Sequence, residues 1–175
     1  MEKIDKSTFG LTIIDMQKNY LASIPIKEKR ILIQRHIDLI EKLKEKDIPI
    51  LTLEMLGKEK TRIEIREKLP KYEELNFKKK NLGGYLLNDK YQEKVKELGI
   101  LNMLYCGLFE NYCVGYTGIE GKSLLGIQPL FAQDLTRPQK LENEKEYNKI
   151  ENMRSEMQKA GTLVKSYKTI LDLLE

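Results

Sequence analysis

A length of 175 residues corresponds to a single domain, residues 1–175, with enough chain to bury a sizeable core. Hydrophobic residues make up 41% of the chain and charged residues 33%, which argues against compositional disorder, and no apolar run is long enough to span a membrane. The net charge is only +4, and lysines alternate with glutamates instead of forming a basic stripe. We therefore expect no nucleic-acid partner.

The N-terminus, the cysteines and the histidine indicate the compartment and the absence of a metal. Residues 1–6 carry alternating charge where a secretory signal needs an apolar stretch, so we expect a cytoplasmic protein. Cys106 and Cys113 are too few for a disulfide framework, and a single histidine, His36, does not allow the usual zinc spacings. We expect neither metal nor cofactor, and we interpret His36 as a surface or interface residue.

Short apolar runs rich in β-branched residues alternate along the chain with longer segments of helical periodicity. The apolar runs predict strands at 9–14, 48–53, 102–106, 127–132 and 162–165, and a poorer strand around Phe77. The periodic segments predict helices at 27–46, 89–98, 113–125, 141–159 and 166–174, and a weaker one at 58–74 that Pro70 interrupts. This alternation predicts an α/β fold with a doubly wound, mostly parallel six-stranded sheet and helices on both faces.

Three side chains stand at or just after the carboxyl ends of predicted strands, where open sheets bind their ligands. They are Asp15, Lys79 and Cys113, which opens the helix after the fourth strand. The partial positive charge of a helix N-terminus favours a thiolate, so Cys113 is the candidate nucleophile, whereas Cys106 lies inside a strand and is interpreted as core packing. Taken singly, the three residues have structural interpretations as a cap, a solvated lysine and a small buried side chain.

The same residues occur in three segments that resemble the isochorismatase-like cysteine hydrolases, the superfamily that includes nicotinamidases and carbamoylsarcosine amidohydrolase. Residues 12–17 resemble the opening strand, with a catalytic aspartate and a glutamine two residues later. Residues 79–85 resemble the lysine segment, in which an aromatic residue lies six residues after the lysine; this selects Lys79, with Lys80 as the alternative. Residues 107–114, followed by Thr117, Gly121, Gly126 and Asp134, resemble the nucleophile helix and the next strand.

The resemblance implies that a Cys113 thiolate attacks an amide-type carbonyl and forms a thioester acyl-enzyme, which water then hydrolyses. Asp15 would take the thiol proton and return it to the leaving amine, and Lys79 would hold the aspartate and favour the thiolate. The resemblance also implies a cis peptide bond between Leu108 and Phe109, and an oxyanion hole made by the amide hydrogens of Phe109 and Cys113. Assembly into a homo-oligomer, a dimer or a tetramer, is implied in the same way.

The sequence departs from the family where the substrate would bind. Residues 53–59 lack the histidines with which nicotinamidases hold a metal beside the pyridine ring, so nicotinamide is not the expected substrate. Isochorismatases that cleave a vinyl ether lack the cysteine, so Cys113 favours hydrolysis of a C–N bond. Phe109 and Glu110 replace a small residue and a threonine. These replacements indicate a substrate of different size and charge, or an activity that has been lost.

Side chains near these strand ends are the candidates for binding substrate: Gln17, Tyr20, Glu54, Tyr85, Glu110 and Tyr112. Packing against neighbours is the alternative for the tyrosines, and a solvated strand end is the alternative for Glu54. We predict a cysteine hydrolase that needs no metal and cleaves a small amide or related C–N bond in a small-molecule substrate. The alternative is a catalytically silent protein that binds a small ligand or a protein partner.

Overall fold

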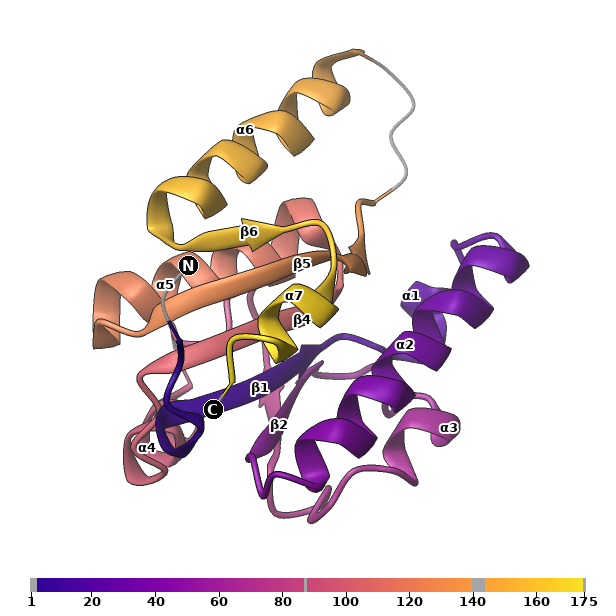
Figure 1. The fold of residues 1–175 in the computed structure, drawn as a ribbon. Helices are drawn as coiled ribbons and strands as arrows, with labels where there is room; N and C mark the ends of the chain where they lie inside the picture. The colour runs from indigo at the N-terminus through magenta and orange to yellow at the C-terminus, as the bar shows by residue number, and fades with distance from the viewer. Residues whose placement is uncertain (1–2, 87, 140–143, 175) are drawn as a thin grey trace.

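Six parallel strands form one sheet in the order β3-β2-β1-β4-β5-β6 (Figure 1). The computed structural model describes residues 3–86, 88–139 and 144–174. The strands are β1 (Phe9–Ile14), β2 (Ile50–Met55), β3 (Asn76–Lys79), β4 (Asn102–Leu108), β5 (Gln128–Arg137) and β6 (Thr162–Val164). The predicted α/β class and six-stranded sheet are confirmed, and every strand pair is parallel.

Helices cover both faces of the sheet (Figure 1). One face carries α1 (Lys18–Leu21), α2 (Ile26–Lys44), α3 (Ile63–Arg66) and α7 (Tyr167–Leu171). The other face carries α4 (Asp89–Glu97), α5 (Gly115–Leu125) and α6 (Glu144–Ala160). Two short turns complete the elements, a 3-10 turn at Lys6–Thr8 and a π-helical turn, η2, at Glu110–Val114.

The alternation of side chains along β1 divides the interior into two core clusters. Leu11 and Ile13 belong to the first cluster, which packs under α2, whereas Ile14 belongs to the second, which packs under α4 and α5. Since helices cover both faces, all six residues of β1 are buried. This explains why the strand reads as a continuous apolar run.

Some elements differ from the prediction. The weak helical pattern at 58–74 yields only the short α3, because Pro70 cannot continue a helix. The short α1 was not predicted. β5 extends past residue 132 to Arg137. The helix predicted from residue 166 is confirmed as α7 with Ser166 as its cap, and the first residues of the helix predicted at 141–159 lie outside the described residues.

His36 is buried in the core and does not lie at the surface, so that interpretation was wrong. It follows Leu32 by four residues and precedes Leu39 by three, which places it on the apolar stripe of α2. Its Nδ1 lies 2.8 Å from the Leu32 carbonyl oxygen, and burial lowers the pKa of the imidazole to about 4.

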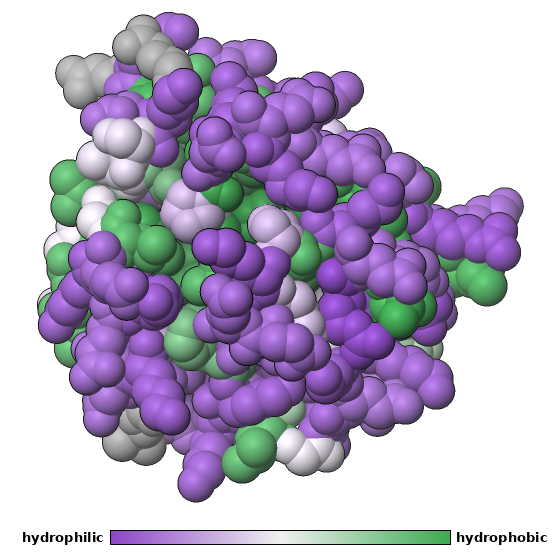
Figure 2. Space-filling view, turned by 90° about the horizontal axis from the view of Figure 1, so that it is seen from below, coloured by the Kyte–Doolittle hydropathy of each residue, from purple (hydrophilic) through white to green (hydrophobic). Residues whose placement is uncertain are grey.

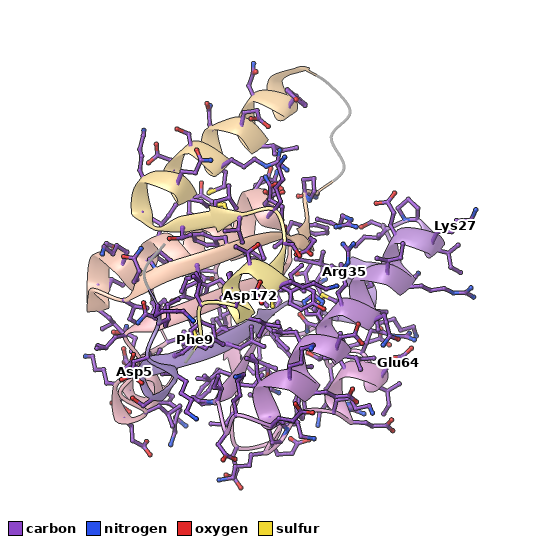
Figure 3. The ribbon with its side chains drawn as sticks, viewed as in Figure 1. Asp5, Phe9, Lys27, Arg35, Glu64 and Asp172 are labelled. Atoms are coloured by element: carbon purple, nitrogen blue, oxygen red, sulfur yellow. The ribbon has the colours of Figure 1, made fainter. Side chains whose placement is uncertain are left out.

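On the same helix, Lys27 extends into solvent from the far end, while Arg35 reaches the Asp134 carbonyl at 3.1 Å (Figure 3).

The surface is largely polar. Hydrophilic residues cover most of the face shown in Figure 2, with separate hydrophobic patches between them. In the described part of the chain, none of the helices has the length and apolar character needed to cross a membrane.

Candidate active site

The order of the strands reverses between β1 and β4. The chain runs from β1 outward through β2 to β3 and then returns to β4 on the other side of β1. Ligands in open parallel sheets bind beyond the carboxyl ends of the strands at such a reversal. Asp15 directly follows β1, and η2 follows β4 after one residue. The candidate site therefore lies at the edge of the sheet that the topology favours.

The three predicted catalytic side chains meet at this edge. The Nζ atom of Lys79, the last residue of β3, lies 2.8 Å from Asp15 Oδ2 and 3.2 Å from Cys113 Sγ. The same ammonium donates a hydrogen bond to the Asn81 carbonyl at 3.1 Å. All three side chains are buried, whereas Lys80 is exposed. Lys79, and not Lys80, therefore belongs to the cluster.

Asp15 is held in an unusual backbone conformation. Its φ of 51° lies in the left-handed region, which aspartate tolerates better than most residues, and its amide donates to the Leu53 carbonyl at 2.9 Å. The carboxylate is buried, and besides Lys79 the Cys113 side chain and the Met55 backbone also form hydrogen bonds with it that lower the pKa of Asp15.

Burial controls the protonation of the three groups. It raises the pKa of the Cys113 thiol to about 12, and the charge of Asp15 acts in the same direction while that of Lys79 opposes it. Burial also raises the pKa of Asp15, against the pull of Lys79. Burial lowers the pKa of Lys79, but the Asp15 charge outweighs this, so that this pKa lies above its usual value. The raised pKa of Cys113 favours its thiol form, and the raised pKa of Lys79 favours its ammonium form.

Cys113 lies inside η2, two residues before α5 begins, and only 6% of the residue is exposed. Burial of the sulfur opposes the thiolate that we expect from its position at the start of a helix, and that expectation stays a prediction. The peptide bond between Leu108 and Phe109 is cis, as the resemblance implied. The oxyanion hole of Phe109 and Cys113 amides stays a prediction.

The Glu110 side chain contacts α6. Its carboxylate is 2% exposed and accepts two hydrogen bonds from Arg154, at 2.8 Å from Nε and 3.0 Å from Nη2. Its charge is thus matched by a guanidinium of α6. The Glu110 carboxylate therefore joins η2 to α6, and its role in substrate binding stays a prediction.

The Glu54 carboxylate also has hydrogen-bond partners within the protein. Its carboxylate is fully buried, accepts the Thr61 amide at 2.7 Å, and accepts hydrogen bonds from the Tyr72 hydroxyl and the Lys78 ammonium. The alternative of a solvated strand end is therefore wrong.

Among the described residues, no three side chains of the types that bind metals gather into a possible metal site.

Gln17 and Tyr85 have structural partners as well. The Gln17 side chain donates to the Glu59 carbonyl at 2.6 Å and accepts the Met55 amide at 2.9 Å, which fastens the chain after β1 to the chain after β2. The Tyr85 hydroxyl lies 2.6 Å from that of Tyr105 inside the second core cluster. The polar atoms of both residues are already engaged within the protein.

Tyr20 and Tyr112 remain near the triad. Both are half-buried, and Tyr112 directly precedes Cys113. Burial and then the charge of Asp15 raise the pKa of Tyr20. A substrate-binding role for Tyr20 and Tyr112 stays a prediction.

Glu120 on α5 is a supporting residue that the sequence analysis missed. Its Oε2 accepts the amides of Tyr85 at 3.0 Å and Leu86 at 3.2 Å, and a Cβ at Gly83 would lie 1.8 Å from its Oε1. Glu120 therefore fixes the loop that follows Lys79. The glycine pair at 83–84 was the available signal, because it marks a place where another group approaches the backbone closely.

Comparisons with known proteins identify the fold. No protein-family model matches the sequence, and neither does any curated protein. Among solved structures, the YcaC gene product of Escherichia coli, described as an octameric hydrolase of unknown specificity, matches with a TM-score of 0.82 and 14% identity, over 98% of this chain and 81% of that one. An isochorismatase from Pseudomonas putida matches with a TM-score of 0.78 and 19% identity, over 97% and 93%. The MAR1 ribonuclease of Caenorhabditis elegans matches with a TM-score of 0.79 and 19% identity, over 98% of this chain and 83% of that one. The chain therefore has the isochorismatase-like hydrolase fold.

Proposed function

We propose that the protein is a cysteine hydrolase that cleaves a small amide or related C–N bond through a thioester on Cys113. The observation that carries the proposal is the position of Lys79 Nζ, within hydrogen-bond reach of both Asp15 Oδ2 and Cys113 Sγ. A nucleophile, a base and a group that orients the base are the parts that acyl transfer requires. The fold alone does not decide the activity, since a ribonuclease shares it.

The chemistry starts from the neutral thiol. As Sγ attacks the carbonyl carbon, its proton passes to Asp15 and a tetrahedral oxyanion forms. The oxyanion collapses, the C–N bond breaks, and the amine leaves with the proton from Asp15, so that a thioester remains. Asp15 then takes a proton from water as the water attacks the thioester. The acid is released, and the proton returns to sulfur.

Lys79 stays charged through this cycle. Its ammonium keeps Asp15 ionised between proton transfers and lies next to the sulfur where negative charge develops. In a buried site such a fixed charge acts more strongly than it would in water. The pathway needs only the side chains already in contact.

Trapping the acyl-enzyme tests this proposal. The protein is incubated with a panel of small amides, and intact mass is measured for an acyl group on Cys113. We expect the Cys113→Ala variant to show no adduct and to lose at least about 10³-fold in turnover. Cys106→Ala is the matched control, because Cys106 is buried in the first core cluster. Equal turnover in the Cys113→Ala variant would remove the proposal.

A catalytically silent binding protein is the second candidate. The raised pKa and deep burial of Cys113 favour it, because they describe an inert thiol as well as one that awaits a base. The same panel of amides separates the two, since a silent protein binds without any change in covalent mass.

We also propose that the protein is a homo-oligomer. The octameric state of the Escherichia coli neighbour supports this, although that protein is only 14% identical. Sedimentation of the purified chain tests it directly: a single species at the mass of one chain would contradict it. A cytoplasmic location and a small-molecule substrate stay predictions from the sequence.

A further inference from the structure

β3 is a short outer strand whose composition is poor for a strand. It spans Asn76–Lys79 and pairs with β2 at the edge of the sheet. Asparagine and lysine are depleted in strands, so the residue types alone specify the register of β3 only weakly. Yet this strand ends in Lys79, whose ammonium contacts both Asp15 and Cys113. A shift of one residue would turn Lys79 to the opposite face of the sheet.

Successive residues of β3 face opposite sides of the sheet. Phe77 packs against the second core cluster, which contains Cys113, and by alternation Lys79 lies on the same side. Lys78 lies on the other side, opposite Glu54 of β2 in the register, and its ammonium donates a hydrogen bond to the Glu54 carboxylate. The contact that Lys78 makes on one face therefore determines the direction in which Lys79 points on the other.

The Glu54 carboxylate is a well-anchored partner for Lys78. It is fully buried and also accepts the Thr61 amide at 2.7 Å and the Tyr72 hydroxyl. Asn76, which shares a face of β3 with Lys78, donates to Glu54 Oε2 at 3.4 Å. Burial acts to raise the pKa of Glu54, but its hydrogen bonds, that of Lys78 first, outweigh burial and bring the pKa below its usual value. Without Lys78 the carboxylate would stay buried and lose its cation, so this pairing is costly to break.

The same end of β2 also holds Asp15. The Asp15 amide donates to the Leu53 carbonyl at 2.9 Å, and Met55 lies opposite Lys79 in the register of β2 and β3. Residues 53–55 therefore hold the end of β1 on one side and the end of β3 on the other. The register between β2 and β3 thus sets the distance between the Lys79 ammonium and the Asp15 carboxylate.

We propose that Glu54 is a positioning residue: by holding Lys78 on one face of the sheet, its carboxylate directs the Lys79 ammonium into the candidate active site on the other. The inference rests on the proposed function, in which Lys79 keeps the base ionised and stabilises the charge that develops on sulfur. Displacement of a catalytic group by about 1 Å can cost a large part of its effect. Glu54 would therefore support the reaction without contact with the substrate.

Competition among adjacent lysines tests the register. The full chain is treated with a limiting amount of acetic anhydride: a neutral amine attacks a carbonyl carbon, acetate leaves, and the amine proton passes to the buffer. Fragment-ion mass mapping then assigns the acetyl group to Lys78, Lys79 or Lys80. In the wild-type protein Lys79 is buried in an ion pair and should react far more slowly than the exposed Lys80. In the Glu54→Gln and Lys78→Met variants, the ratio of Lys79 to Lys80 labelling should rise at least about tenfold.

Three further variants separate positioning from loss of stability. Tyr72→Phe removes a hydrogen bond to the same carboxylate but keeps its pair with Lys78, so it should lower the free energy of unfolding and leave the labelling ratio unchanged. Lys78→Arg keeps a cation beside Glu54 and should keep the wild-type ratio. The Glu54→Gln/Lys78→Met double variant leaves no unpaired charge at this place, which maintains the test if a single variant does not fold.

Turnover connects the register to the reaction. With an amide from the panel as substrate, kcat should fall in the variants whose labelling ratio rises, whereas KM should change little, because Lys79 acts on groups that react after the substrate is bound. Tyr72→Phe should keep the wild-type kcat, since Tyr72 contacts Glu54 and not Lys78 or the triad.

Three results would overturn the inference: an unchanged labelling ratio in Glu54→Gln, Lys78→Met and their double variant, an equal rise in Tyr72→Phe, or a raised ratio with the wild-type kcat. Failure of the proposed function looks different. In that case the ratio responds as expected, but no amide acylates Cys113 in the wild-type protein. Conversely, a wild-type acyl-enzyme with an unchanged ratio in the variants retains the hydrolase and removes the positioning role of Glu54.

Discussion

Lys79 determines the electrostatics of the candidate site, because it is the buried cation between Asp15 and Cys113. Removing one partner of a buried ion pair leaves the other charge unpaired, which typically costs about 3–5 kcal/mol. We expect Lys79→Met to lower the free energy of unfolding by this amount. The Asp15→Asn/Lys79→Met double variant should recover much of the loss, since it buries no charge. Urea denaturation measures the two single variants, Asp15→Asn and Lys79→Met, and the double variant.

The neighbouring lysine, Lys80, provides the control for the Asp15 and Lys79 substitutions. Lys80 is exposed, so Lys80→Met should change the free energy of unfolding by less than about 0.5 kcal/mol. If the effects of the Asp15 and Lys79 substitutions simply add in the double variant, the two side chains are not coupled, and the electrostatic description of the site is wrong.

His36 gives the protein an acid-sensitive stability. Burial lowers its folded-state pKa from 6.5 to about 4, so between these pH values the unfolded chain binds a proton that the folded chain does not. Stability from this residue is present above pH 6.5 and is lost as the pH falls toward 4, by roughly 3 kcal/mol in total. His36→Leu should flatten this part of the curve of unfolding free energy against pH. An identical slope in the variant would assign the acid sensitivity to other groups.

At the residue scale, the sequence could identify candidate functional side chains but not the residues that contact them. Asp15 and Cys113 were predictable because strand ends locate them without knowledge of distant contacts. Glu54 was not, because the Tyr72 and Lys78 side chains that bury its charge come from other parts of the chain. His36 was a different kind of error, since its place on the apolar stripe of α2 was visible in the spacing.

At the scale of elements, α6 packs against η2, the turn that contains Cys113. Arg154 binds both oxygens of the buried Glu110 carboxylate, and a Cβ at Gly115 would lie 2.3 Å from Met153 Sδ, so the two elements are in close contact. We expect Arg154→Met to cost about 3 kcal/mol of unfolding free energy, at the lower end for buried pairs because the Arg154 side chain is 30% exposed. In the Arg154→Met variant, amide hydrogen exchange should accelerate more in η2 than in the rest of the chain.

An exposed pair on the same helix provides a matched comparison. Lys159 and Glu156 lie 2.7 Å apart with both side chains in solvent, so Lys159→Met should cost less than about 0.5 kcal/mol. Combining Glu110→Gln with Arg154→Met should restore part of the lost stability. If both helix variants have equally small effects, the Glu110–Arg154 pair does not hold the turn.

Elements were predictable where one physical signal dominated. β1 and β4 are continuous apolar runs because both faces of the sheet are covered, and their existence follows from composition alone. A turn after β4 was predicted, but the helix that follows it was expected to begin at Cys113 and begins at Gly115, because residue types at 113–114 do not distinguish the end of η2 from the first turn of an α-helix. The predicted start of that helix was therefore two residues too early.

At the scale of the whole molecule, the strand order assembles the site. Asp15, Lys79 and Cys113 are remote in sequence, and they meet because β1 lies between the strands that lead to the other two. The two cysteines lie in different core clusters, Cys106 in the first and Cys113 in the second. Only the cysteine after the carboxyl end of β4 can share a site with Asp15 and Lys79.

The close approach of β1 and β4 at this end requires a glycine. Gly107 pairs with Ile14, has a φ of 110°, and a Cβ there would lie 2.0 Å from the Ile14 carbonyl oxygen. Backbone cannot move aside as a side chain can, so Gly107→Ala should separate the strands that carry Asp15 and the nucleophile turn. We expect it to cost about 4 kcal/mol or more of unfolding free energy and to remove amide hydrolysis.

A second glycine with a positive φ provides a comparison in which no clash arises. Gly99 also has a positive φ, 65°, but a Cβ there would meet nothing within 4 Å. Gly99→Ala should therefore cost only the left-handed penalty of about 1–2 kcal/mol and retain hydrolysis. Urea denaturation and turnover of the same amide are measured for both variants. Equal losses would mean that φ alone matters and that contact between β1 and β4 does not set the spacing of the site.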